Sequence, residues 1–156
     1  MPVNKKKIRI KSPKNKNTIF GLPAKFYTDS EFWEKECNTV LSDGWLFVGF
    51  VHEFNKVGDA QPIFIAGRPI LLIKNENNEI TAFHNVCSHR CLKLVKEKKN
   101  IGKLIRCPYH SWSYDLQGNL KATPHIGGTN NHKPKGFNFK KHGLKPIRIH
   151  IWNDWI

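Results

Sequence analysis

Two short segments of the 156-residue chain carry cysteine and histidine at a spacing that suits a metal site. The first is Cys87-Ser88-His89 and the second is Cys107-Pro108-Tyr109-His110. Each segment follows a run of residues typical of a β-strand, so two tight turns can present four side chains to one point. Thiolate and imidazole together select zinc, iron or an iron–sulfur cluster over magnesium or calcium.

Three interpretations of these four side chains compete. A structural zinc site uses the same ligand types, but zinc fingers usually pair cysteine with cysteine and histidine with histidine. A Rieske-type [2Fe–2S] centre requires the mixed pairing found here, because two cysteines bind one iron and two histidines bind the other. The third interpretation, buried residues without a metal, is disfavoured because four ligand-type residues in two short turns seldom coincide. We favour the iron–sulfur centre, which would carry electrons.

The flanking residues resemble the N-terminal Rieske domain of ring-hydroxylating and related non-haem iron oxygenase α-subunits. The resemblance is strongest at residues 87–90 and 107–120, and it reaches back through Gly44-Trp45 to Leu22-Pro23-Ala24. It therefore covers the chain from residue 20 to its end. It implies a cluster held by four ligands, with the cysteines on the inner iron and the histidines on the outer iron: Cys87, Cys107, His89 and His110.

The resemblance also implies residues that surround the cluster, namely Arg90, Tyr109 and Trp112. Tyr109 stands where the respiratory type of Rieske protein has a disulfide-forming cysteine, so Cys91 has no partner of that kind. Cys91 itself occupies a position where the oxygenases usually have glycine, and we interpret it as a small packing residue rather than a fifth ligand. Trp112 replaces a hydroxyl residue of the respiratory type, which predicts a reduction potential of about −150 mV, near the low end of the Rieske range.

In such oxygenases the Rieske domain takes one electron from a ferredoxin or flavin reductase and passes it to a mononuclear Fe(II) site in a separate catalytic domain. The remaining late histidines show no spacing typical of that second site, so we expect the catalytic domain to be absent from this chain: His125, His132, His142 and His150. The substrate stays open between aromatic rings and quaternary amines. The full-length protein would be a homo-oligomer, a trimer. The alternatives are a standalone Rieske ferredoxin and a zinc-stabilised binding module.

The hydrophobic pattern predicts a mainly β fold with two small antiparallel sheets and one N-terminal helix. Asp29 or Ser30 should cap that helix, and Gly44 should end it. Expected strands lie at 45–51, 61–66, 70–74, 80–84, 103–106, 112–115, 119–122 and 144–152. The expected organisation is a basic flexible tail (1–19), a helical lead-in with a first strand (20–50) and the Rieske domain (51–156). The end reads as a hairpin cut off after its turn, which suggests a fragment of a longer protein.

The net charge is +14, and two lysine-rich segments bear on the choice of partner. The tail holds many lysines but no interleaved aromatic residues, so nucleic acid is a disfavoured partner. Five lysines lie between the cluster segments and form either a solvated surface or a docking patch for an acidic electron donor: Lys93, Lys96, Lys98, Lys99 and Lys103. No apolar run resembles a signal peptide or a membrane span, which predicts a cytoplasmic protein without a membrane partner.

Overall fold

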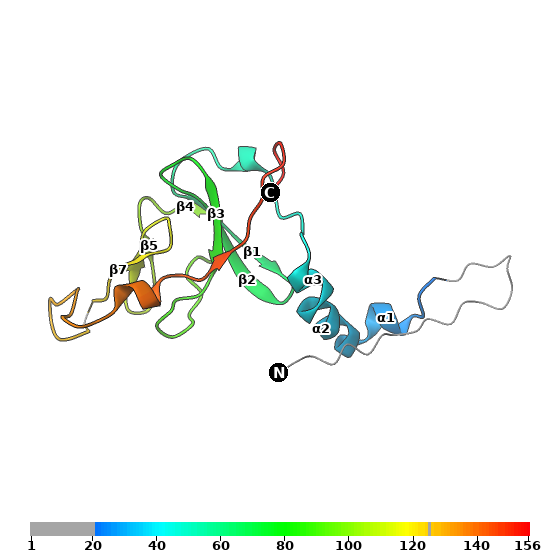
Figure 1. Cartoon of the computed structure of the whole chain (residues 1–156), viewed down its shortest axis with the longest axis horizontal. Coiled ribbons are helices and arrows are strands. Elements are labelled where there is room, and N and C mark those ends of the chain that lie inside the picture. The colour runs from blue at the N-terminus through cyan, green and yellow to red at the C-terminus, as the bar shows by residue number, and fades with distance from the viewer. Residues whose placement is uncertain (1–20, 125) are drawn as a thin grey trace, which may run out of the picture.

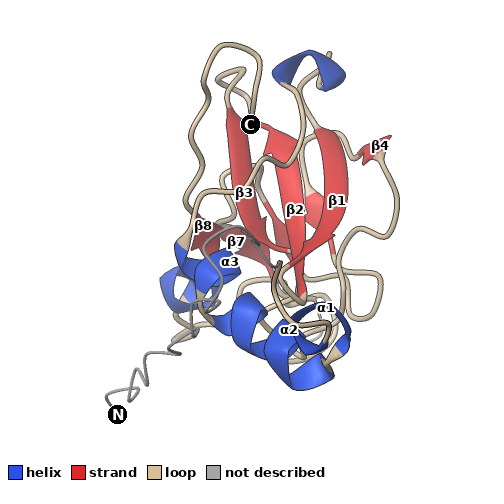
Figure 2. Ribbon diagram, turned by 90° about the vertical axis from the view of Figure 1, so that its right-hand side faces the viewer, coloured by secondary structure: helices blue, strands red, loops and turns tan. Residues whose placement is uncertain are grey.

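A five-stranded antiparallel sheet forms the frame of the molecule in the computed structural model, which describes residues 21–124 and 126–156. Its long strands are β1 (Asp59–Ile65), β2 (Arg68–Lys74) and β3 (Ile80–His84), which lie side by side in Figure 2. Ala66 and Gly67 close the first hairpin at φ values of 49° and 73°, as a two-residue hairpin turn requires. The strands expected at 61–66, 70–74 and 80–84 are confirmed with small shifts at their ends.

The edges of this sheet differ from the expectation. The sheet order is β4-β1-β2-β3-β8, and β4 (Lys99–Asn100) was not expected as a strand. The strand expected at 144–152 is reduced to β8 (Pro146–Ile147). Beyond β8 the chain leaves β3, and its side chains pack instead on Trp45, over whose ring the Arg148 guanidinium lies at 5.7 Å. The alternating sequence pattern predicted a strand here, but it could not show that only two of its residues pair with β3.

A three-stranded sheet, β5-β6-β7, carries the second half of the predicted site. Its strands are β5 (Ile105–Arg106), β6 (Ser113–Tyr114) and β7 (Leu120–Ala122), which confirm the expected strands in shorter form. One apolar core joins the two sheets, with members from β2, β3, β5 and β6: Leu71, Phe83, Ile105 and Tyr114. In Figure 1 this small sheet and the N-terminal helices lie at opposite ends of the molecule.

The expected N-terminal helix is present but interrupted. Short α1 (Lys25–Thr28) precedes α2 (Ser30–Asn38), and α3 (Val40–Asp43) follows. The Asp29 side chain caps α2 by accepting a hydrogen bond from the Glu31 amide at 2.8 Å, and the helical segment ends at Gly44 as expected. The break falls at Thr39, whose φ of −127° and ψ of −88° are not helical.

The apolar face predicted for this helix is largely exposed. Trp33 is 56% exposed and Val40 is 69% exposed. Within α2 only Cys37 is buried, in agreement with its interpretation as a small hydrophobic residue. Spacing identified which side chains share a face, but the described part of the chain places no sheet over most of that face.

The segment expected as a strand at 45–51 forms no strand, and only Phe50 makes an isolated bridge, with Trp155. It meets the end of the chain instead: the Val48 amide donates to the Ile156 carbonyl, and the Ile156 amide donates to the Gly49 carbonyl, both at 2.9 Å. Ile156 is buried in a second apolar cluster against Phe54. The tight turn expected at 153–154 is confirmed by the bridge between Trp152 and Trp155, and Ile156 is in addition paired with residues 48 and 49.

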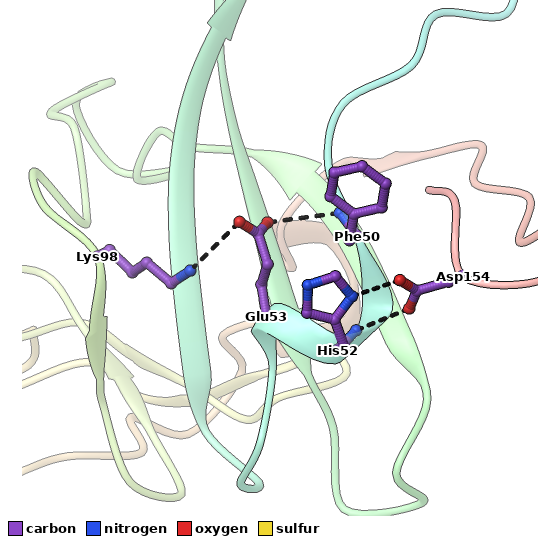
Figure 3. Close-up of polar contacts among 5 residues, drawn as sticks. All are labelled: Phe50, His52, Glu53, Lys98 and Asp154. Carbon is purple, nitrogen blue, oxygen red and sulfur yellow. Dashed lines mark hydrogen bonds and ion pairs between the residues drawn. The ribbon is translucent and has the colours of Figure 1, made fainter.

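A polar clamp holds the C-terminal hairpin against the 3₁₀ turn η1 (Val51–Glu53), as Figure 3 shows. The Asp154 carboxylate accepts a hydrogen bond from the His52 amide at 2.9 Å and contacts His52 Nδ1. The hydrogen bond from the His52 ring holds the pKa of Asp154 below its usual value. Glu53 Oε2 accepts from the Phe50 amide at 3.4 Å, and Lys98 lies 4.0 Å from the same carboxylate.

The predicted basic tail at 1–19 lies outside the described residues. Among the residues that the structure describes, no helix is long and apolar enough to cross a membrane.

A substitution at Gly118 tests the contact between the two sheets. Its φ is +81°, and an added Cβ would lie 2.5 Å from Cε1 of the buried Phe83 ring. Gly67 has a similar φ of +73° but open space around its Cβ position. Gly67→Ala should therefore lower the free energy of unfolding by about 1 kcal/mol through backbone strain alone, whereas Gly118→Ala should cost about 1–3 kcal/mol more because the ring must move. Urea unfolding followed by tryptophan fluorescence measures both, and equal midpoints would contradict the contact.

Candidate functional site

The two predicted ligand loops share one backbone conformation. In each loop the amide of the cysteine donates to the carbonyl five residues later, and its carbonyl accepts from the amide four residues later. These distances are 2.8 and 2.9 Å in the loop of Cys87 and 2.8 and 3.0 Å in the loop of Cys107. The first loop follows β3, and the second connects β5 to β6. Two similar turns on neighbouring sheets thus face one another with their cysteines inward.

Both loops require a left-handed residue at the same place. Cys91 has a φ of 54° and Ser111 a φ of 56°, and each lies four residues after its cysteine. This conformation suits glycine, since it strains residues that carry a Cβ. Because the Cys91 side chain is exposed, its interpretation as a packing residue is wrong, and the demand of this position is on the backbone.

The four predicted ligand side chains form two pairs. Cys87 and Cys107 are 1% and 3% exposed, and their sulfur atoms are close enough for Cys107 to raise the pKa of Cys87, although burial is the larger cause. The rings of His89 and His110 have centroids 4.9 Å apart. In the described part of the chain, no three His, Cys, Asp or Glu side chains converge on a single ion. Two separate pairs suit a two-iron cluster, whereas a structural zinc ion needs four ligands around one point.

Each histidine of the pair has one feature that suits metal ligation. Burial, then the neighbouring His110 and Arg90, lower the pKa of His89, so its ring is neutral at neutral pH. Nδ1 of His110 is buried and has no hydrogen-bond partner among the described residues. Leaving a buried polar nitrogen unsatisfied costs about 1–3 kcal/mol. A bond from this nitrogen to a metal would remove that cost, so the residues present fit the cluster.

A buried hydroxyl stabilises negative charge on the cysteine pair. Tyr114 Oη lies 3.1 Å from Cys87 Sγ and accepts a hydrogen bond from the Ser88 amide at 3.1 Å. Burial raises the pKa of Tyr114, so it stays a phenol and can donate. Sequence reasoning did not select Tyr114 or Ser88. The signal was present, because Tyr114 lies two residues after Trp112 in the strand expected at 112–115, and alternate residues of a strand share a face.

Two of the predicted surrounding residues each contact a predicted ligand histidine. Trp112 is buried and stacks on His89 with ring centroids 4.7 Å apart and planes at 8°. Tyr109 is 56% exposed, with its ring centroid 3.7 Å from that of His110. Arg90 is exposed beside His89 and acts on it through charge. The aromatic rings thus shield the histidine pair from two sides.

The late histidines do not assemble a second metal site within the described residues. His142 packs against Phe137 with ring centroids 4.6 Å apart, and His150 lies near Trp45 at 6.1 Å. His132 is exposed, and His125 lies outside the described residues. His132 and His150 are thus on the surface as expected, whereas His142 is half-buried among aromatic rings.

Comparison with known proteins gives one family. The sequence pattern of the Rieske [2Fe–2S] domain matches residues 44–133. The glycine betaine monooxygenase oxygenase subunit of Pseudomonas aeruginosa (strain PAO1) is 34% identical over 144 residues, which are 92% of this chain and 32% of that protein. The carnitine monooxygenase oxygenase subunit of Escherichia coli (strain K12) is 31% identical over 91% of this chain and 37% of its own length. The chain thus spans about a third of the length of these curated relatives.

Solved structures agree on the fold. A crystal structure of the quaternary ammonium Rieske monooxygenase CntA superposes with a TM-score of 0.76 at 24% identity, over 86% of this chain and 37% of that one. A naphthalene 1,2-dioxygenase superposes with a TM-score of 0.74 at 27% identity, over 83% of this chain and 29% of that one. The chain belongs to the Rieske [2Fe–2S] domain family, and its Rieske domain is related to those of Rieske oxygenase α-subunits.

Proposed function

We propose that this chain holds a [2Fe–2S] cluster through its cysteine and histidine pairs and relays single electrons to a mononuclear iron site in an oxygenase catalytic domain. The observation that supports it best is the division of the four side chains into a buried sulfur pair and a neighbouring imidazole pair. The cluster would supply one-electron redox chemistry, with a potential raised by its neutral histidine ligands. The proposed ligands are Cys87, Cys107, His89 and His110.

The burial of the side chains indicates from which side the electron donor and acceptor would approach the proposed cluster. The cysteines are buried in the core that joins the two sheets, so the sulfur side of the site is dry. The histidines are partly exposed, and Tyr109 extends the imidazole side to the surface. Electron donor and acceptor would therefore meet the chain at its histidine side, where the least protein separates them from the cluster.

The oxygenase assignment rests on the relatives. The two curated relatives named above are oxygenase subunits whose names state glycine betaine and carnitine as substrates. We therefore infer quaternary-amine oxidation ahead of aromatic-ring hydroxylation for the complete system. A ferredoxin or flavin reductase would supply the electrons. The catalytic domain, in a homotrimer, would receive them.

Removing a ligand should remove the cluster. His110→Ala leaves one iron with a single protein ligand, so the purified variant should lose the red-brown colour, the EPR signal of the reduced state and bound iron. His150→Ala is the matched control, because this exposed histidine lies against Trp45 and away from the ligand pairs. Iron analysis, visible absorption and EPR measure the result. A colourless wild-type protein containing one zinc per chain would contradict the proposal.

The reduction potential should lie near the low end of the Rieske range, about −150 mV. One phenol lies beside a cysteine sulfur, but Trp112 offers no hydroxyl, and hydrogen bonds to sulfur are what raise this potential. A redox titration followed by EPR gives the midpoint. A value well above zero would show that further donors reach the cluster.

The lysines of the expected docking patch differ in their surroundings. Lys98 lies 4.0 Å from Glu53 and over the Phe54 ring, and Lys99 lies 4.0 Å from Glu97 on the edge strand β4. Lys93 instead follows the first ligand loop, where its backbone pairs with Val86. Steering of an acidic donor would therefore depend on Lys93 more than on Lys99.

Reduction by an acidic donor protein should slow as salt is added, because screening weakens long-range attraction. At low salt Lys93→Gln should lower the second-order rate constant by roughly two- to three-fold, and Lys99→Gln should change it less. Stopped-flow absorbance of the cluster measures both. If the rate is independent of ionic strength, the lysines form only a solvated surface.

A further inference from the structure

Three polar groups link Cys87 to the 3₁₀ turn η2 (Phe139–His142). Tyr114 Oη lies 3.1 Å from Cys87 Sγ and 2.9 Å from Ser88 Oγ. Ser88 Oγ in turn lies 2.6 Å from the backbone carbonyl oxygen of His142. Tyr114 is fully buried, so its hydroxyl forms hydrogen bonds with these protein atoms and not with bulk water.

The number of available hydrogens determines which group donates and which accepts in each of these contacts. A carbonyl oxygen only accepts, so the 2.6 Å contact commits the single hydroxyl hydrogen of Ser88 to His142. Ser88 Oγ then presents only lone pairs to Tyr114. The Ser88 amide already donates to Tyr114 Oη at 3.1 Å. The phenol has one hydrogen of its own, and two acceptors lie within reach of it: the sulfur of Cys87 and the hydroxyl oxygen of Ser88.

We propose that Ser88 is a positioning residue that weakens the hydrogen bond from Tyr114 to Cys87 by sharing the phenolic hydrogen, and thereby lowers the reduction potential of the cluster. The inference deepens the proposed function and rests on it, since the potential belongs to a cluster bound through Cys87. Ser88 acts only through Tyr114.

The direction of the effect follows from charge. Reduction adds negative charge to the cluster and its ligand sulfurs, and a hydrogen bond to sulfur favours the reduced state. A hydrogen that Tyr114 divides between two acceptors stabilises that charge less than one given wholly to sulfur. Burial raises the pKa of both the Cys87 thiol and the Tyr114 phenol. Because water is excluded there, the hydrogen bond from Tyr114 to Cys87 has a larger effect on the charge of the sulfur than it would have in water.

Midpoint potentials of four cluster-loaded proteins test the inference. Ser88→Ala removes the competing acceptor, so its potential should lie above that of the wild type. Tyr114→Phe removes the donor, so its potential should lie below the wild type. The double variant should match Tyr114→Phe, because Ser88 has nothing to compete for once the phenol is gone. Redox titration followed by EPR gives all four values.

Ser88→Thr is the matched control, since it keeps a hydroxyl at the same atom and should keep the wild-type potential. A residue that only ties η2 to the ligand loop would shift the potential equally with or without the Tyr114 hydroxyl. The inference is overturned if Ser88→Ala fails to raise the potential, if its shift persists beside Tyr114→Phe, or if Ser88→Thr shifts as far as Ser88→Ala.

The same samples separate this inference from the proposed function. A wild-type protein without a Rieske EPR signal contradicts the proposed function, and with it the inference. Normal signals in all variants with no shift for Ser88→Ala contradict the inference alone.

Discussion

The constraint on which the rest of the structure depends is the burial of two cysteine sulfurs where water cannot solvate a thiolate. Burial raises the pKa of Cys87, so a thiolate there needs compensating positive charge or hydrogen-bond donors. The protein supplies a phenol 3.1 Å from Cys87 Sγ, and the imidazole pair lies in the same two loops as the cysteines. The proposed cluster would supply the remaining charge. The apolar core between the sheets is therefore also the wall of the site, and both cysteines belong to it.

Two loops with the same backbone conformation, one for each cysteine, meet this constraint. Each ligand loop closes on its own cysteine through the same two backbone hydrogen bonds, and each bends through a left-handed residue at the same place. Cys91 and Ser111 occupy those places, and both carry a Cβ that the conformation disfavours. The packing of the sheets behind the loops has to outweigh this strain. Close contacts such as that of Gly118 with Phe83 are part of that packing.

The sequence was sufficient where local rules decide the outcome. The three long strands, the Asp29 cap and the two ligand turns follow from alternation, side-chain capping and spacing. It was insufficient where distant segments decide. The strands expected at 45–51 and 144–152 are absent or much shorter, because their pairing depends on where the end of the chain runs. For the site, residue types suggested the ligands, whereas Tyr114 and Ser88 act through hydrogen positions that no spacing encodes.

The ligand motif alone does not determine the reduction potential. The four proposed ligands determine the kind of cluster, but the energy of its extra electron depends on donors near the sulfur. Here that means a single phenolic hydrogen with two acceptors at 3.1 and 2.9 Å. The second acceptor is held in place by the carbonyl of His142, which is 54 residues from Ser88 in the sequence. In the proposed site the tertiary fold would thus set the reduction potential, through a residue that does not bind the metal.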